Sequence, residues 1–110
     1  MSYNIYTTSS FEKELKNLSK KYRSIKEDIL SLSKSLKNNP LQGISLGKDC
    51  YKVRMAITSK NTGKSSGARV ITCVKIVNKN IYLLSIFDKS EKENISDEGL
   101  TKIIKSSELI

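Results

Sequence analysis

The chain reads Cys50-Tyr51-Lys52-Val53-Arg54-Met55-Ala56-Ile57 near its middle, and apolar and basic side chains alternate along this stretch. A period of two is typical of a β-strand with one buried face, because successive side chains of a strand point to opposite sides. Lys52 and Arg54 therefore share one face of the predicted strand, and most of the apolar side chains share the other. The stretch predicts a sheet with one apolar face and one cationic face.

Two further strands are predicted after this one. A polar, glycine-bearing segment occupies residues 58–67, and apolar and β-branched residues then dominate 68–77 and 81–87. The turn at 77–80 is short enough to join the last two strands as a hairpin. With the first strand at about 50–58, these segments predict an antiparallel three-stranded meander.

The strand at 68–77 carries another basic side chain toward the cationic face. Alternation places Arg69 on the same side as Ile71 and Cys73, and both faces of the strand are partly apolar. Apolar residues on both faces are typical of a central strand that is covered on both sides. We expect Arg69 to join Lys52 and Arg54 on the open face.

Two helices are predicted before the meander, and a short strand at 3–7 precedes them. Ser9 with Glu12 three residues later is a capping-box pattern, and Ser24 with Glu27 repeats it. Apolar residues at helical spacing follow each box, and the second helix ends before the single proline. The stripes are Phe11, Leu15, Leu18 and Tyr22 in the first helix and Ile25, Ile29, Leu32 and Leu36 in the second.

The remaining segments complete a single-domain prediction. Residues 41–49 are interpreted as a connecting loop, and Ser96 caps a final helix from Asp97 to about Lys105. A chain of 110 residues fits one compact domain, so we predict a single domain over residues 1–110. The predicted fold is α+β, with an N-terminal strand, a two-helix hairpin, an antiparallel three-stranded meander and a short C-terminal helix.

Positive charge is concentrated in the middle of the chain. The formal net charge is +9, and residues 48–79 contain eight Lys or Arg against one Asp, which gives this segment +7. Arg54 and Arg69 are two of only three arginines among twenty basic residues. A guanidinium offers phosphate a planar fork that an ammonium lacks. The pattern is typical of a protein with a nucleic-acid or acidic-protein partner, although solvated surface lysines alone also produce such a charge.

The composition does not favour several other kinds of site. There is no histidine, and Cys50 and Cys73 each lie in an apolar run, so we interpret both as reduced structural residues and predict no metal or cofactor. Gly63-Lys64-Ser65 resembles the end of a phosphate-binding loop, but it leads into a strand and not into a helix. We see neither an apolar run of the ~20 residues that span a membrane nor an export signal, so we predict a cytoplasmic protein without membrane partners.

Three segments resemble one known family. Asp49–Arg54, Gly63–Ile71 and Tyr82–Lys89 are similar, in this order and spacing, to the RelE/HigB toxins of bacterial type II toxin-antitoxin systems, within the RelE/ParE superfamily. The resemblance spans nearly the whole chain. The long glycine-bearing loop before Arg69 is closer to the HigB-like branch, and the family's RelE-like fold agrees with the elements predicted above.

The resemblance also implies a function. Such a protein is a toxin that enters the A site of the 30S ribosomal subunit, contacts rRNA and mRNA, and inhibits translation by cleaving the mRNA. A cognate antitoxin protein silences it. The endoribonuclease reaction uses no metal, because the 2′-hydroxyl of RNA attacks the adjacent scissile phosphate while the protein aligns the attack, moves protons and neutralises charge.

Positions that match the family pattern imply the catalytic residues. Lys52 corresponds to the general base, and Arg54 and Arg69 correspond to a clamp on the scissile phosphate. Lys89, which the third strand delivers to the margin of the sheet, is a further phosphate contact or the acid. Lys64 in the loop is predicted to contact RNA. The other predicted RNA contacts are Lys60, Lys48 and Phe87, whose ring can stack on a base.

The sequence departs from the family pattern in its proton-transfer groups. Ile95 lies where some members have a tyrosine, and the chain has no histidine, so only Lys89 remains for the acid. We therefore expect poor cleavage of free RNA. Two other functions stay open: a ParE-like inhibitor of DNA gyrase, and a non-catalytic RNA-binding member. Lys52, Arg54 and Arg69 argue against the gyrase inhibitor, which needs no phosphate chemistry.

Overall fold

The structure is a computed structural model that describes residues 3–92 and 94–107. Within these residues, three α-helices pack on one five-stranded sheet, so the predicted α+β class is confirmed. The strands are β1 (Asn4–Thr7), β2 (Ile44–Gly47), β3 (Cys50–Met55), β4 (Ala68–Lys75) and β5 (Asn80–Asp88). The α-helices are α1 (Ser9–Ser19), α2 (Ile25–Asn38) and α3 (Asp97–Ser106), and two short 3-10 helices are η1 (Thr58–Lys60) and η2 (Lys64–Ser66).

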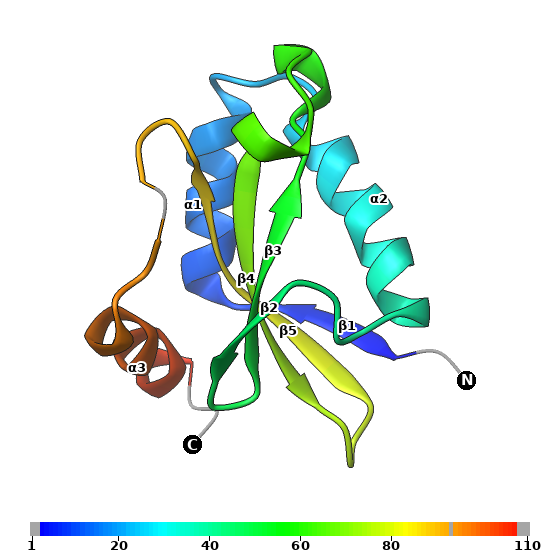
Figure 1. Cartoon of the computed structure of the whole chain (residues 1–110), viewed down its shortest axis with the longest axis vertical. Helices are drawn as coiled ribbons and strands as arrows, with labels where there is room; N and C mark the ends of the chain where they lie inside the picture. The colour runs from blue at the N-terminus through cyan, green and yellow to red at the C-terminus, as the bar shows by residue number, and fades with distance from the viewer. Residues whose placement is uncertain (1–2, 93, 108–110) are drawn as a thin grey trace.

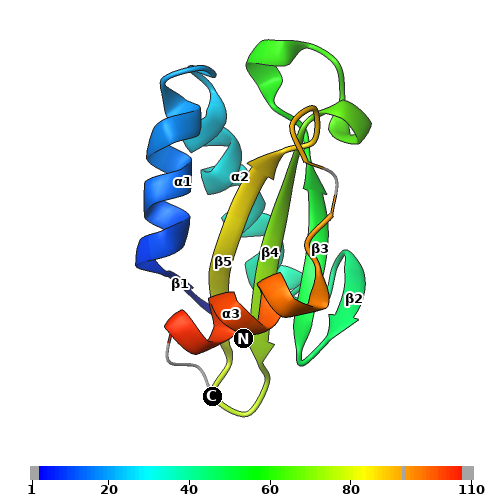
Figure 2. The ribbon, with the colours of Figure 1, turned by 90° about the vertical axis from the view of Figure 1, so that its left-hand side faces the viewer.

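The helices divide between the two faces of the sheet. Helices α1 and α2 cover one face, and α3 lies across the lower part of the other (Figures 1 and 2). The larger core lies between the sheet and the α1–α2 pair and includes Phe11, Ile25, Leu36, Val70 and Ile86. A smaller core, here called the α3-side core, contains Cys50, Ile71, Cys73, Leu84, Phe87, Leu100 and Ile104.

The alternation of the middle stretch is confirmed. Val53 and Met55 of β3 belong to the core under α1 and α2, whereas Cys50 belongs to the α3-side core. Lys52 and Arg54 alternate with Val53 and Met55 and so lie on the α3 side of the sheet. Only one side of β3 at Lys52–Met55 is buried, and this one-sided burial imposes the period of two. The pattern could therefore be recognised in the sequence.

The sheet has one strand that the sequence did not predict. Residues 41–49 were expected to be a loop, but β2 pairs there antiparallel with β3, up to the pair Ile44↔Lys52. This strand has four residues and is mostly exposed at the edge of the sheet, so it has no buried face to impose a pattern. The predicted N-terminal strand is present, and it pairs parallel with β5, from Asn4↔Asn80 to Thr7↔Leu83.

Helix starts agree with the predictions to within one residue. Thr8, not Ser9, caps α1, since its Oγ1 accepts from the Phe11 N–H at 3.1 Å; Glu12 instead accepts from the Thr7 hydroxyl at 2.6 Å. Helix α3 begins after Ser96 as expected, and the Ser96 Oγ accepts from the Gly99 N–H at 2.9 Å.

A close approach of two backbones fixes the end of the 58–67 segment. A Cβ atom at Gly67 would lie 2.2 Å from the Met55 carbonyl oxygen and 2.9 Å from the Ile57 nitrogen. We expect Gly67→Ala to lower the free energy of unfolding by about 2 kcal/mol, because either strand must move to admit the methyl group. Urea denaturation checks this, with the exposed Ser65→Ala as the control. Equal stability of the two variants would show that the backbones separate at no cost.

Candidate functional site

The sheet brings three predicted site residues together on its α3 side. Arg54 of β3 and Arg69 of β4 are direct cross-strand partners, and Lys52 lies two positions from Arg54 on the same face. Side chains directly opposite in an antiparallel pair have Cβ atoms about 5 Å apart. Arg54 is exposed and Lys52 is half-exposed. The predicted grouping of these three residues on one face is therefore correct.

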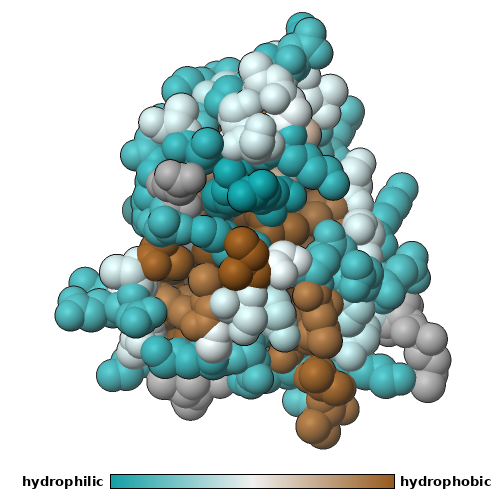
Figure 3. Space-filling view, in the orientation of Figure 1, coloured by the Kyte–Doolittle hydropathy of each residue, from teal (hydrophilic) through white to brown (hydrophobic). Residues whose placement is uncertain are grey.

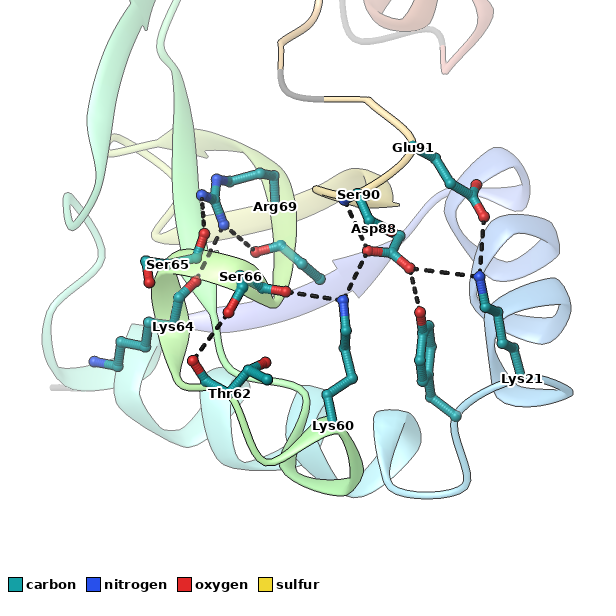
Figure 4. Close-up of polar contacts among 12 residues, drawn as sticks. Lys21, Lys60, Thr62, Lys64, Ser65, Ser66, Arg69, Asp88, Ser90 and Glu91 are labelled. Carbon is teal, nitrogen blue, oxygen red and sulfur yellow. Dashed lines mark hydrogen bonds and ion pairs between the residues drawn. The ribbon is translucent and has the colours of Figure 1, made fainter.

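The exposure predicted for Arg69 is wrong. Its side chain is only 3% exposed, and its guanidinium donates to the carbonyl oxygens of Ser65 at 2.9 Å, Ala68 at 3.1 Å and Lys64 at 3.2 Å (Figure 4). The segment before β4 folds back over the guanidinium. These contacts anchor η2, and they depend on a loop conformation that strand alternation does not reveal.

Arg69 should therefore contribute to stability in a way that Arg54 does not. We expect Arg69→Ala to lower the free energy of unfolding by roughly 2 kcal/mol, since it leaves carbonyl groups of η2 without their charged donor. Arg54→Ala removes an exposed side chain from the neighbouring strand and should change stability by less than about 0.5 kcal/mol. Chemical denaturation of both variants checks the difference, and similar losses would contradict this role of Arg69.

The accessible cations occupy the end of β3 and the loop above it. The Lys52 ammonium donates to the Asn94 side-chain oxygen, in the segment between β5 and α3. Arg54 and Lys64 both line a pocket of about 300 Å³ between the end of β3 and α2, where Asp28 is the charged residue on the helix. Lys64 is exposed, and its side chain points away from Arg69 (Figure 4). Hydrophilic side chains cover this upper end of the molecule in Figure 3, with apolar groups below them.

Asp88 forms a buried cluster of polar contacts that the sequence reasoning missed. Its carboxylate accepts from the Tyr22 hydroxyl, from the Ser90 N–H at 3.0 Å and from the Lys60 ammonium at 3.3 Å, and Lys21 lies 3.9 Å away (Figure 4). Burial raises the pKa of Asp88, but the hydrogen bonds from Tyr22, Ser90 and Lys60 outweigh it and lower the pKa to about 2. One carboxylate thus joins the α1–α2 turn, the loop after β3 and the exit from β5.

Two residues that were predicted to contact RNA, Lys60 and Phe87, make their contacts within the protein. Lys60 is half-buried, and its ammonium also donates to the Ser66 carbonyl oxygen at 2.9 Å, so it holds the loop and does not extend from the cationic face. Phe87 is 7% exposed within the α3-side core, and the Lys92 ammonium lies 4.9 Å from its ring centroid. Base stacking requires an open ring face, so the structure does not support that prediction for Phe87.

The last two predicted residues lie in different places. Lys48 is exposed in the turn between β2 and β3, at the opposite end of β3 from Arg54, and so does not join the other cations. Lys89 is half-buried. Its backbone N–H donates to the Gly67 carbonyl oxygen at 3.0 Å, and this bond extends the β4–β5 ladder by one residue. Alternation from Phe87 places Lys89 on the same side of the sheet as Arg69.

Among residues 3–92 and 94–107, no group of three or more His, Cys, Asp or Glu side chains is arranged to hold a metal ion. The same part of the chain contains no helix with the length and apolar character needed to cross a membrane.

The fold and the site define a small α+β protein with basic residues on one face of its sheet. The chain matches a protein family described as the RelE toxin of the RelE / RelB toxin-antitoxin system over residues 3–109, and it belongs to that family. No curated protein matches it.

Solved structures of similar fold include toxins of this kind. A free-state RelE toxin from E. coli with two arginine-to-alanine substitutions has a TM-score of 0.64 and 18% identity, covering 96% of this chain and 98% of that one. The isolated E. coli RelE toxin has a TM-score of 0.60 and 17% identity, with the same coverage. In the RelBE2 toxin-antitoxin complex of Mycobacterium tuberculosis, the similar chain has a TM-score of 0.58 and 13% identity, covering 80% of this chain and 99% of that one.

Proposed function

We propose that this RelE-family toxin is a ribosome-dependent endoribonuclease that inhibits translation by cutting mRNA in the A site. The observation that carries the proposal is the accessible pair Lys52 and Arg54, which lie on one side of β3 at the uncovered end of the sheet. The net charge of +9 favours binding to RNA.

The reaction is intramolecular attack within the RNA. The 2′-oxygen bonds to the scissile phosphorus, and the bond from phosphorus to the 5′-oxygen breaks, which leaves a 2′,3′-cyclic phosphate and a 5′-hydroxyl. Lys52, in its neutral form, accepts the 2′-hydroxyl proton at Nζ. Arg54 neutralises the charge that develops on the phosphorane. Lys89 supplies the proton that the departing 5′-oxygen takes up.

Arg69 has a different proposed role from the one that the family resemblance implies. Because its guanidinium is bound to the carbonyl groups of η2, it acts as a positioning residue that holds Lys64 beside Arg54. A direct clamp on phosphate would require the η2 segment to move, because the Arg69 side chain is only 3% exposed.

The proposed protein partner is a cognate antitoxin. A segment rich in Asp or Glu would neutralise the basic face and compete with RNA for Lys52, Arg54 and Lys64. An antitoxin that covers another surface would instead prevent entry into the A site by its size.

The test is translation-coupled mapping of mRNA 5′ ends after induction of the protein. Lys52→Ala and Arg54→Ala are the informative variants, and Lys37→Ala, an exposed lysine at the end of α2, is the charge-matched control. The proposal predicts cuts within translated codons that disappear in the first two variants only. Intact mRNA with trapped gyrase–DNA breaks would instead indicate a ParE-like inhibitor. Intact mRNA with blocked translation would indicate a non-catalytic RNA-binding protein.

A further inference from the structure

The two cysteines lie directly opposite each other across β3 and β4. Cys50 and Cys73 are register partners, both thiols are unoxidised, and both side chains are at most 1% exposed. The sequence indicated only that each lies in an apolar strand. Their pairing depends on the register of the hairpin, which the sequence did not fix.

The ladder shows which kind of pair they form. The Val74 N–H donates to the Asp49 carbonyl oxygen at 2.9 Å, so the ladder hydrogen bond joins the residues next to the cysteines, and the cysteines are a non-hydrogen-bonded pair. Non-hydrogen-bonded pairs in antiparallel sheets have Cα atoms about 4.5 Å apart, and their side chains lie closer together than those of hydrogen-bonded pairs. This separation is at the short end of the range that a disulfide spans.

The two thiols differ in their surroundings. The Cys50 thiol donates to the Lys48 carbonyl oxygen at 3.4 Å, and the neighbouring sulfur of Cys73 and burial raise the pKa of Cys50. The neighbouring sulfur of Cys50 and the positive charge of Lys75 lower the pKa of Cys73. Cys73, unlike Cys50, also lines a pocket beneath α3, so we assign Cys73 as the nucleophile of the pair and Cys50 as the resolving thiol.

The pocket beneath α3 extends to Cys73. It has a volume of about 310 Å³, and Cys73 lines it together with Thr101 and Ile104 of α3. Lys48 and Lys75 lie at the same pocket, where Asp49 pairs with Lys75 at 3.5 Å. The cations outnumber the one carboxylate, which favours an anionic reagent.

We propose that Cys50 and Cys73 form a reversible intrachain disulfide by exchange with a small anionic disulfide that enters beneath α3. The Cys73 thiolate attacks one sulfur of the reagent, forming a mixed disulfide and breaking the reagent's S–S bond, so that the first half leaves as a thiolate. Cys50 passes its proton to this thiolate, which becomes the first thiol. Cys50 then attacks Cys73 Sγ, forming the Cys50–Cys73 bond, and the second half leaves as a thiolate that takes a proton from water. Two protein thiols are oxidised, and the reagent disulfide is reduced to two thiols. The inference does not depend on the ribonuclease activity.

The test uses the folded, reduced chain at low concentration, treated with oxidised glutathione and then alkylated for mass spectrometry. The expected product has lost two hydrogens, resists alkylation at both cysteines and returns to the dithiol form with dithiothreitol. Cys50→Ala should accumulate one glutathione adduct at Cys73. Cys73→Ala should react about tenfold more slowly, because Cys50 lacks both the pocket and the lowered pKa.

The wild-type result alone can overturn the proposal. Retention of two alkylatable thiols by the native protein, under conditions that oxidise the urea-unfolded chain, would show that the pair is inert. A stable glutathione adduct on the wild type, or a disulfide between two chains, would show that Cys50 does not resolve the exchange.

Discussion

Replacement of Lys52 by alanine is expected to lower the rate of mRNA cleavage on the ribosome by roughly 10²–10⁴-fold, the usual contribution of a general base. The fold should survive, because Lys52 is half-exposed and its side chain contacts Asn94 near the surface. Single-turnover cleavage of an mRNA bound in the A site measures the effect separately from binding. The loss should fall on the rate at saturating ribosome concentration, with little change in the concentration at half-saturation.

Two companion variants separate the proton-transfer role from simple charge. Lys52→Arg keeps the positive charge but cannot supply a neutral base, so it should stay nearly as slow as Lys52→Ala. Asn94→Ala removes the hydrogen-bond partner and should cost far less than the loss of Lys52 itself. If Lys52→Arg cleaves at the wild-type rate, Lys52 contributes charge and not proton transfer.

Replacement of Asp88 by asparagine is expected to lower the free energy of unfolding by roughly 3 kcal/mol, which is more than we expect for Gly67→Ala or Arg69→Ala. The carboxylate is fully buried, and its removal leaves the half-buried Lys60 ammonium without its anionic partner. Urea denaturation measures the loss. Glu91→Gln, an exposed acid that pairs with Lys21 at the edge of the same cluster, is the matched control and should cost less than about 1 kcal/mol.

The contribution of Asp88 to the free energy of unfolding should decrease as the pH falls. Its pKa in the folded protein is lowered to about 2 from an ordinary value of 3.8, so the unfolded chain takes up the proton first as the pH falls. The stabilisation is therefore complete at pH values above 3.8 and is lost as the pH falls through about 2. The difference in stability between the wild type and Asp88→Asn should shrink by about 2 kcal/mol over this range. A difference that stays constant with pH would show that Asp88 acts by packing alone.

Strand alternation made much of the fold predictable, and the reason is burial. Residues 50–57 follow a period of two because one side of β3 faces the core under α1 and α2. The apolar stripes of α1 and α2 were predictable for the same reason, because these faces pack into the same core. Strand β2 was not, since its side chains are mostly exposed and no core selects them.

The candidate site was only partly predictable, because side-chain partners come from distant segments. Alternation correctly placed Arg54 and Arg69 on one face, but the carbonyl groups that bury Arg69 belong to a loop whose path has no periodic pattern. The role of Asp88 was not predicted, although an acid directly after the apolar run of β5 was a usable signal of a buried ion pair. Its partners Tyr22 and Lys60 lie far away in the sequence.

The parallel pairing of β1 with β5 has a consequence for the time at which the protein becomes active. Residues 4–7 can complete the sheet only after residues 80–83 are available, so the sheet edge cannot close on a partly synthesised chain. Contacts between such distant segments also slow folding. We expect the nascent chain to lack a complete sheet until residues 80–83 have left the ribosome that makes it. Under the proposed function, this order of assembly would keep the toxin inactive until residues 80–83 have emerged.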